Sequence, residues 1–117
     1  MRNFRNLKVW QESITFATEI YKLTESFPDK EKYGLCSQMQ RAAVSISSNI
    51  AEGSAKRTAT DFAKYLDISL GSAFELETQL TIAQQIGYIA NEAFEKLLDT
   101  LTIIQKQTNQ LRTKILE

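Results

Sequence analysis

The stretch from Gln38 to Gly53 reads QMQRAAVSISSNIAEG, and it constrains the fold more than any other part of the chain. Large apolar residues recur at helical spacing at Met39, Ile46 and Ile50, while alanine and serine fill most of the positions between them. Small side chains allow a neighbouring helix to approach closely. The stretch therefore predicts a helix inside a compact all-helical packing unit, and it contains no pattern typical of a reaction.

Helical periodicity extends over nearly the whole chain, which has only 4 Gly and 1 Pro in 117 residues. So few breakers favour long helices over many short strands. The apolar spacing predicts helices over residues 7–27, about 29–52, from Thr58 to about 86, and from 91 onward. Four such helices with short connections predict a single all-α domain over residues 1–117, an up-down-up-down antiparallel four-helix bundle.

The predicted helix boundaries depend on residues that start or stop helices. Pro28 biases Phe27 away from helix and so separates the first two helices. Side chains that can cap a helix N-terminus occur at Asp29, Thr58 and Asn91. Glycines that can end a helix occur at Gly53 and Gly87.

The first predicted helix carries two adjacent apolar stripes. One stripe consists of Val9, Phe16, Ile20, Leu23 and Phe27. The other consists of Leu7, Trp10, Ile14, Ala17 and Tyr21. An apolar arc this wide predicts burial on two sides, either within the bundle alone or also against another subunit. We expect a subunit interface that includes Trp10, Ile14, Tyr21 and, on the third helix, Phe74.

The third and fourth helices have narrower apolar stripes. The face of the third consists of Phe62, Leu66, Ser69, Ala73, Leu76, Leu80 and Ala83. The fourth alternates spacings of three and four through Phe94, Leu97, Leu101, Ile104, Thr108, Leu111 and Ile115. The second pattern is typical of the seam of an antiparallel bundle or coiled coil.

The composition excludes most catalytic chemistry. The chain has no histidine, so it lacks the commonest general base and the commonest nitrogen ligand for metals. Neither of the glycine-rich phosphate-binding motifs occurs. The one cysteine, Cys36, lies in a helical pattern and is predicted to be a small buried apolar residue rather than a nucleophile. We expect no catalytic residues, no metal site and no cofactor, hence a protein that is not an enzyme.

The sequence also predicts a cytoplasmic location. A single cysteine cannot form an internal disulfide, which fits a reducing compartment. The opening MRNFRNL has no apolar core like that of a signal peptide. No apolar run approaches the roughly 18 residues of a membrane helix, so we expect no membrane contact.

Charged residues balance at 14 basic and 14 acidic, but the basic ones gather near two predicted helix starts. These residues are Arg2, Arg5, Lys8, Lys56, Arg57 and Lys64. The first and third helices of an up-down bundle start at the same end, where their N-termini would add positive potential. The pattern predicts an anion-binding end, against the alternative of charges scattered over solvated faces.

Arg41 is a further candidate contact to a phosphate or to a partner, since a guanidinium offers a planar fork of donors. Its alternative interpretation is an arginine on a helix surface or interface that pairs with a carboxylate. Asn49, near the end of the same predicted helix, is interpreted as a structural hydrogen-bond donor.

Three segments, in this order, carry a resemblance to a known family. They are FRNLKVWQE (residues 4–12), RAAVSISSNIAEG (residues 41–53) and FAKYLDISLGSAFELETQL (residues 62–80). With them the chain resembles the four-helix bundle family of ribosomal RNA intervening-sequence proteins. The accessory variability proteins of diversity-generating retroelements resemble the same family.

The resemblance implies a bacterial four-helix bundle that assembles into a ring-shaped homopentamer and has a role connected with nucleic acid. The retroelement relatives are basic, bind nucleic acid and partner a reverse transcriptase, whereas this chain has balanced charge. We expect an oligomer that binds structured RNA or DNA through its basic end. The alternative is an adaptor ring that binds another protein and makes no nucleic-acid contact of its own.

Overall fold

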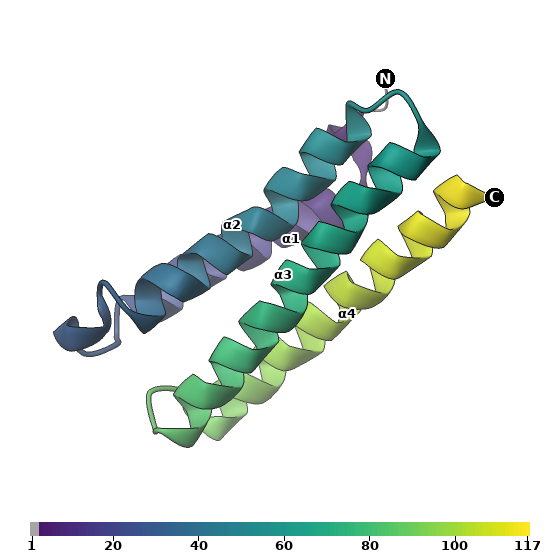
Figure 1. The fold of residues 1–117 in the computed structure, drawn as a ribbon. Coiled ribbons are helices and arrows are strands. Elements are labelled where there is room, and N and C mark those ends of the chain that lie inside the picture. The colour runs from purple at the N-terminus through teal and green to yellow at the C-terminus, as the bar shows by residue number, and fades with distance from the viewer. Residues whose placement is uncertain (1–2) are drawn as a thin grey trace.

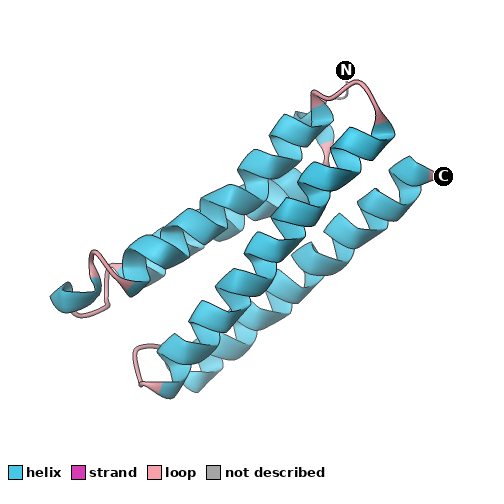
Figure 2. Cartoon of the chain, in the orientation of Figure 1, coloured by secondary structure: helices cyan, strands magenta, loops and turns pink. Residues whose placement is uncertain are grey.

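The structure is a computed structural model that describes residues 3–117. Its elements are the 3-10 helix η1 (Phe4–Asn6), α1 (Lys8–Thr24), the 3-10 helix η2 (Asp29–Glu31), α2 (Leu35–Ser54), α3 (Ala59–Gln85) and α4 (Asn91–Leu116). Over residues 3–117 the chain forms helices and connecting loops without any strand (Figure 2). The predicted all-α class is confirmed.

Each long helix packs against the next one in the chain, and α1 also packs against α4, which closes the bundle (Figure 1). The result is the predicted up-down-up-down four-helix bundle, with principal extents of 44 × 25 × 20 Å. The purple start of the chain, the α2–α3 connection and the yellow end of α4 lie at one end of the molecule (Figure 1). The α1–α2 and α3–α4 connections lie away from that end.

The core is made from the predicted apolar faces. Every residue of the predicted stripe on α3 is buried, from Phe62 to Ala83. On α4 the seam is buried at Leu101, Ile104 and Thr108 and partly buried towards both helix ends. Of the two stripes on the first helix, the one through Phe16 enters the core. In the other stripe Leu7, Trp10 and Ala17 are partly buried against the core, whereas Ile14 and Tyr21 are exposed.

Small side chains bring α2 and α3 together, as their sequence indicates. Ser69 is fully buried and donates a hydrogen bond of 2.8 Å to the backbone carbonyl of Ile46. The hydroxyls of Ser45 and Ser72 lie 2.8 Å apart across the same interface. Asn49 donates to the Ser45 backbone carbonyl at 2.8 Å, so it is the structural hydrogen-bond donor that the sequence predicts.

The first helix boundary differs from the prediction. The helix α1 ends at Thr24, and Asp29 begins η2 instead of capping α2. Pro28 has extended backbone angles, and its carbonyl then accepts the N–H of Glu31 at 2.9 Å, which closes a single tight turn. This turn lies between α1 and α2, and α2 begins at Leu35.

Two further boundary predictions are wrong. Gly53 lies within α2 and does not terminate it, because in residues 3–117 only Gly87 has a positive φ among the glycines, at 89°. Asn91 is the first residue of α4 and not its cap, since the cap position is Ala90. Thr58 does cap α3, accepting the Asp61 N–H at 3.1 Å, and the stop at Gly87 is confirmed.

Candidate functional site

One end of the bundle collects the N-terminal segment, the α2–α3 connection and the last turns of α4 (Figure 1). The described lysines and arginines in these segments and in the first turns of α1 and α3 are Arg5, Lys8, Lys56, Arg57, Lys64, Arg112 and Lys114. We call this surface the basic end. Arg2, which the sequence also assigns to it, lies outside the described residues.

Three of these cations have carboxylate partners. Lys8 lies 3.8 Å from Glu12, and Lys64 lies 3.9 Å from Asp61. Arg112 of α4 donates two hydrogen bonds to the two carboxylate oxygens of Asp67 on α3. Each pair offsets its own charge locally and, being at the surface, contributes little to stability.

Four cations of the basic end form no ion pair with any carboxylate in residues 3–117, namely Arg5, Lys56, Arg57 and Lys114. The Arg5 guanidinium carbon lies 4.6 Å from the centre of the Phe4 ring, and the Lys56 ammonium lies 5.0 Å from that of Tyr65. Arg57 is exposed. Aromatic faces attract cations without neutralising them, so the charges of Arg5 and Lys56 are oriented but remain available to an anion.

The N-terminal segment is held against the bundle by aromatic packing. Phe4 meets Trp10 edge to face, with ring centroids 5.1 Å apart, and η1 packs against both α1 and α2. Arg5 also accepts a 2.8 Å hydrogen bond from the Gln11 amide at its backbone carbonyl. The sequence showed the cations, but the rings that support them become evident only in the folded chain.

The helix macrodipoles do not add to the positive potential as the sequence suggests. The N-termini of α1 and α3 lie at the basic end, and so do the C-termini of α2 and α4 (Figure 1). Two positive and two negative dipole ends largely offset one another. The potential of this end therefore comes from its side chains.

Arg41 does not belong to the basic end. It is exposed on α2 and lies fifteen positions before Lys56, which corresponds to about 22 Å along a helix. It pairs with no carboxylate among residues 3–117, so the paired alternative is not observed.

The residues predicted for a subunit interface lie on two different faces. Ile14 and Tyr21 are 42% and 46% exposed on the side of α1 that borders α2, with Trp10 half-buried in the same stripe. Phe74 is 52% exposed on α3. It lies two helical turns from Asp67, which bonds to α4, so Phe74 is on the α4 side of α3.

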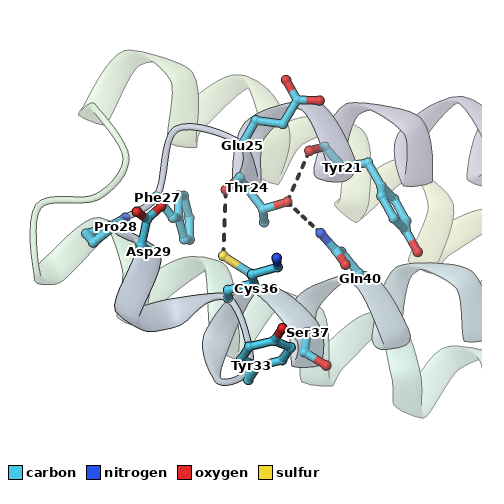
Figure 3. Close-up of a pocket in the computed structure, with 11 residues that line it drawn as sticks. Tyr21, Thr24, Glu25, Phe27, Pro28, Asp29, Tyr33, Cys36, Ser37 and Gln40 are labelled. Carbon is cyan, nitrogen blue, oxygen red and sulfur yellow. Dashed lines mark hydrogen bonds between the residues drawn. The ribbon is translucent and has the colours of Figure 1, made fainter.

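A cavity of about 590 Å³ lies between the end of α1 and the start of α2, remote from the basic end (Figure 3). Inside it the Gln40 amide donates to the Thr24 hydroxyl at 3.0 Å, and the Cys36 thiol approaches the Thr24 carbonyl at 3.6 Å. Tyr33, at its mouth, is 88% exposed. No pattern in the sequence predicted this cavity.

Burial raises the pKa of the Cys36 thiol above 9.0, and the Glu31 carboxylate raises it further. The thiol is therefore protonated at neutral pH and is a poor nucleophile. Within residues 3–117 no three His, Cys, Asp or Glu side chains gather as metal ligands. No helix in this part of the chain has the length and apolar character needed to cross a membrane.

Comparison with known proteins places the chain in a family. Among solved structures it is similar to a protein of unknown function from the S23 ribosomal protein family of Bacteroides thetaiotaomicron, with 28% identity and a TM-score of 0.83. That similarity covers 90% of this chain and 95% of the other. None of the curated proteins compared with the chain matches it. Residues 5–110 match the family described as 23S rRNA-intervening sequence protein. The chain therefore belongs to the 23S rRNA-intervening sequence protein family.

Proposed function

We propose that this protein is a non-enzymatic, oligomeric helical bundle that binds structured RNA or DNA through its basic end. The observation that carries the proposal is the group of four cations of the basic end that have no carboxylate partner within residues 3–117: Arg5, Lys56, Arg57 and Lys114. The family resemblance supports a role connected with nucleic acid in the cytoplasm of a bacterium.

Balanced overall charge is compatible with this function, because binding depends on local potential more than on net charge. Guanidinium and ammonium groups contact phosphates without reading sequence, so the expected ligand is defined by its density of phosphates. A ring of several chains would repeat these cations around its axis and so multiply a weak contact.

The first test is fluorescence anisotropy with a labelled structured rRNA fragment and a labelled DNA duplex over a salt series. Binding should weaken linearly in log salt, with a slope of about −0.9 for each phosphate contacted. The variant Lys56→Glu/Arg57→Glu should lose binding, because two of the four unpaired cations of the basic end become anions.

A matched control reverses the same amount of charge elsewhere. Lys30→Glu/Lys32→Glu changes two exposed lysines near the α1–α2 connection, and it should bind like the wild type. Equal affinity of the Lys56→Glu/Arg57→Glu variant and the wild type would contradict a contact through the basic end. If both double variants weakened nucleic-acid binding equally, the loss of affinity would be an effect of net charge alone.

We also propose the homopentamer that the family resemblance implies. Two exposed apolar faces, one through Ile14 and Tyr21 on α1 and one at Phe74 on α3, support it. Different faces on the two sides of a chain suit head-to-tail contacts, which close into rings. Light scattering on the eluting protein should give five times the chain mass.

The second candidate is an adaptor ring that binds another protein. The exposed Tyr33 at the mouth of the 590 Å³ cavity favours it, since exposed aromatics beside a concave surface are common at protein interfaces. The anisotropy series separates the candidates. Absence of binding even at low salt would exclude the nucleic-acid function and favour the adaptor.

A further inference from the structure

A second cavity, of about 320 Å³, lies at the basic end, where the start of α1 meets the last turns of α4 (Figure 1). Its volume is at the lower end of the range for small-ligand pockets, about 300–1,000 Å³. It therefore has room for one small organic group. The lining residues are Leu7, Lys8 and Val9 at the start of α1 and Gln107, Gln110, Leu111 and Lys114 on α4.

The lining of this cavity combines an apolar wall with hydrogen-bond donors. Val9 is buried, and Leu7 and Leu111 are half-buried. The remaining lining side chains are two lysines and two glutamines, and no carboxylate is among them. Such a lining is suited to a ligand that has an apolar body and an anionic end.

Lys114 provides the cavity with a cation that is free to bind an anion. It has no carboxylate partner within residues 3–117. Lys8 lies 3.8 Å from Glu12, but its side chain is 78% exposed, so this ion pair is weak and its ammonium can also reach an anion in the cavity. One free and one loosely paired ammonium are suited to a single phosphate group.

Gln107 has an amide oxygen that is buried without any hydrogen-bond partner in residues 3–117. A buried amide oxygen that lacks a donor is unfavourable. The terminal torsion of a glutamine is soft, and a half-turn about it exchanges the amide oxygen and nitrogen. Because Gln107 lines the cavity, its amide can present either an acceptor or two donors to a bound group.

We propose that this cavity holds one unpaired nucleotide of the bound nucleic acid. Its base would lie against the apolar wall, its phosphate at Lys114, and its edge at the Gln107 amide. A phosphate ion alone would leave the apolar wall uncovered, and a purely apolar ligand would leave Lys114 without an anion. Bases in a duplex are stacked and paired, so only a bulged, looped or terminal nucleotide offers a base to a cavity.

The assignment deepens the proposed nucleic-acid function and rests on it, because the cavity belongs to the basic end. The cations outside the cavity, Arg5, Lys56 and Arg57, contact phosphates of a paired stem without reading its sequence. The cavity adds a preference for nucleic acid that carries an unpaired nucleotide beside that stem. Gln107 is then a specificity-determining residue, since it is the uncharged side chain that meets the base edge.

The test is fluorescence anisotropy with two labelled RNA hairpins that differ by one bulged nucleotide. The wild type should bind the bulged hairpin at least about fivefold more tightly, the factor that one net hydrogen bond provides. Gln107→Leu should lose this preference and bind both hairpins as the wild type binds the paired one. Its urea midpoint should not fall, because the substitution removes the buried oxygen that has no partner.

Gln85→Leu is the matched control, since Gln85 is exposed at the end of α3 remote from the basic end, and it should keep the preference. A free nucleoside monophosphate at roughly a hundredfold excess over the hairpin should not displace it, because it lacks the other phosphate contacts. Displacement would overturn the assignment in favour of a free nucleotide.

Two other outcomes separate the cavity from the function on which it rests. Equal, salt-dependent binding of both hairpins by the wild type would overturn the nucleotide site and leave the nucleic-acid function intact, as would an unchanged preference in Gln107→Leu. Absence of binding to either hairpin at low salt would overturn both.

Discussion

Gly53 of α2 and Tyr65 of α3 lie so close that a β-carbon on Gly53 would stand 2.6 Å from the β-carbon of Tyr65. The same β-carbon would lie 2.8 Å from the Phe62 ring. The β-carbon of Tyr65 is fixed to its backbone and cannot turn aside. Glycine is therefore required at position 53 by the approach of α3, although the backbone there is an ordinary helix.

Gly53→Ala should destabilise the protein despite the better helix propensity of alanine. Overpacking costs about 1–3 kcal/mol, whereas alanine contributes at most about 1 kcal/mol relative to glycine within a helix. Gly71→Ala is the control, since nothing lies within 4 Å of a β-carbon built on this exposed position of α3. In urea unfolding, the midpoint should fall for Gly53→Ala and rise for Gly71→Ala. A higher midpoint for both variants would contradict the close contact at Gly53.

Ser69→Ala should lower the free energy of unfolding by about 1 kcal/mol, the usual net contribution of a buried hydrogen bond. The substitution removes the donor to the Ile46 carbonyl without adding volume. Thr78→Ala provides the comparison, because its hydroxyl bonds within its own helix and is exposed. If the urea midpoint moved equally for both variants, the hydrogen bond between α2 and α3 would contribute no more to stability than an exposed hydroxyl within one helix.

Alkaline pH should destabilise the protein through Tyr88. The Tyr88 hydroxyl donates a 2.7 Å hydrogen bond to Glu31, and this bond, followed by burial, raises the Tyr88 pKa above 10.0. A raised folded-state pKa means that the folded chain keeps a proton that the unfolded chain has released. The stabilisation is therefore complete below pH 10 and is lost as pH rises through the folded-state pKa.

The check is the free energy of unfolding of the wild type and Tyr88→Phe, measured from pH 7 to pH 11. The variant should be less stable at neutral pH and should decline less steeply above pH 10. If the free energy of unfolding declined with pH equally in the wild type and in Tyr88→Phe, the alkaline destabilisation would not come from Tyr88. Cys36, whose pKa burial raises above 9.0, contributes a decline of the same sign from a lower pH, so Cys36→Ala should flatten the curve near pH 9.

Phe74→Glu should reduce the mass of the oligomer, because a carboxylate would be buried at the predicted subunit contact. Ile68→Glu is a matched control, since Ile68 is also 52% exposed on α3 but is not assigned to that contact. Light scattering gives the mass, and circular dichroism shows that both variants remain helical. An unchanged mass for Phe74→Glu would remove this residue from the interface.

Much of the fold was predictable because periodicity reports burial directly. In the apolar stripes through Phe62 on α3 and Leu101 on α4, every central residue is buried in the core. The boundaries at Asp29, Gly53 and Asn91 were mispredicted, since each residue type suits more than one role. Whether a glycine ends a helix or admits a neighbouring helix depends on what packs against it, and one sequence does not contain that information.

The candidate site was predictable only in outline. Up-down topology brings Arg5 and Lys56 to one end, and this followed from helix order alone. Arg112 also lies at this end, because α4 is long enough to reach it, and there it pairs with Asp67. The rings of Phe4 and Tyr65 meet their cations through tertiary packing, which has no periodic signature.

The connection between α2 and α3 consists of residues 55–58 only, so the two helices that pack most extensively are also neighbours along the chain. Contacts that need little loop closure form early in folding. We expect substitutions at Gly53 or Ser69 to slow refolding, whereas substitutions along α1 and α4 should mainly accelerate unfolding. The tight serine-rich contact would then be the nucleus of the folding transition state, and closure of the first helix against the last would be the final step.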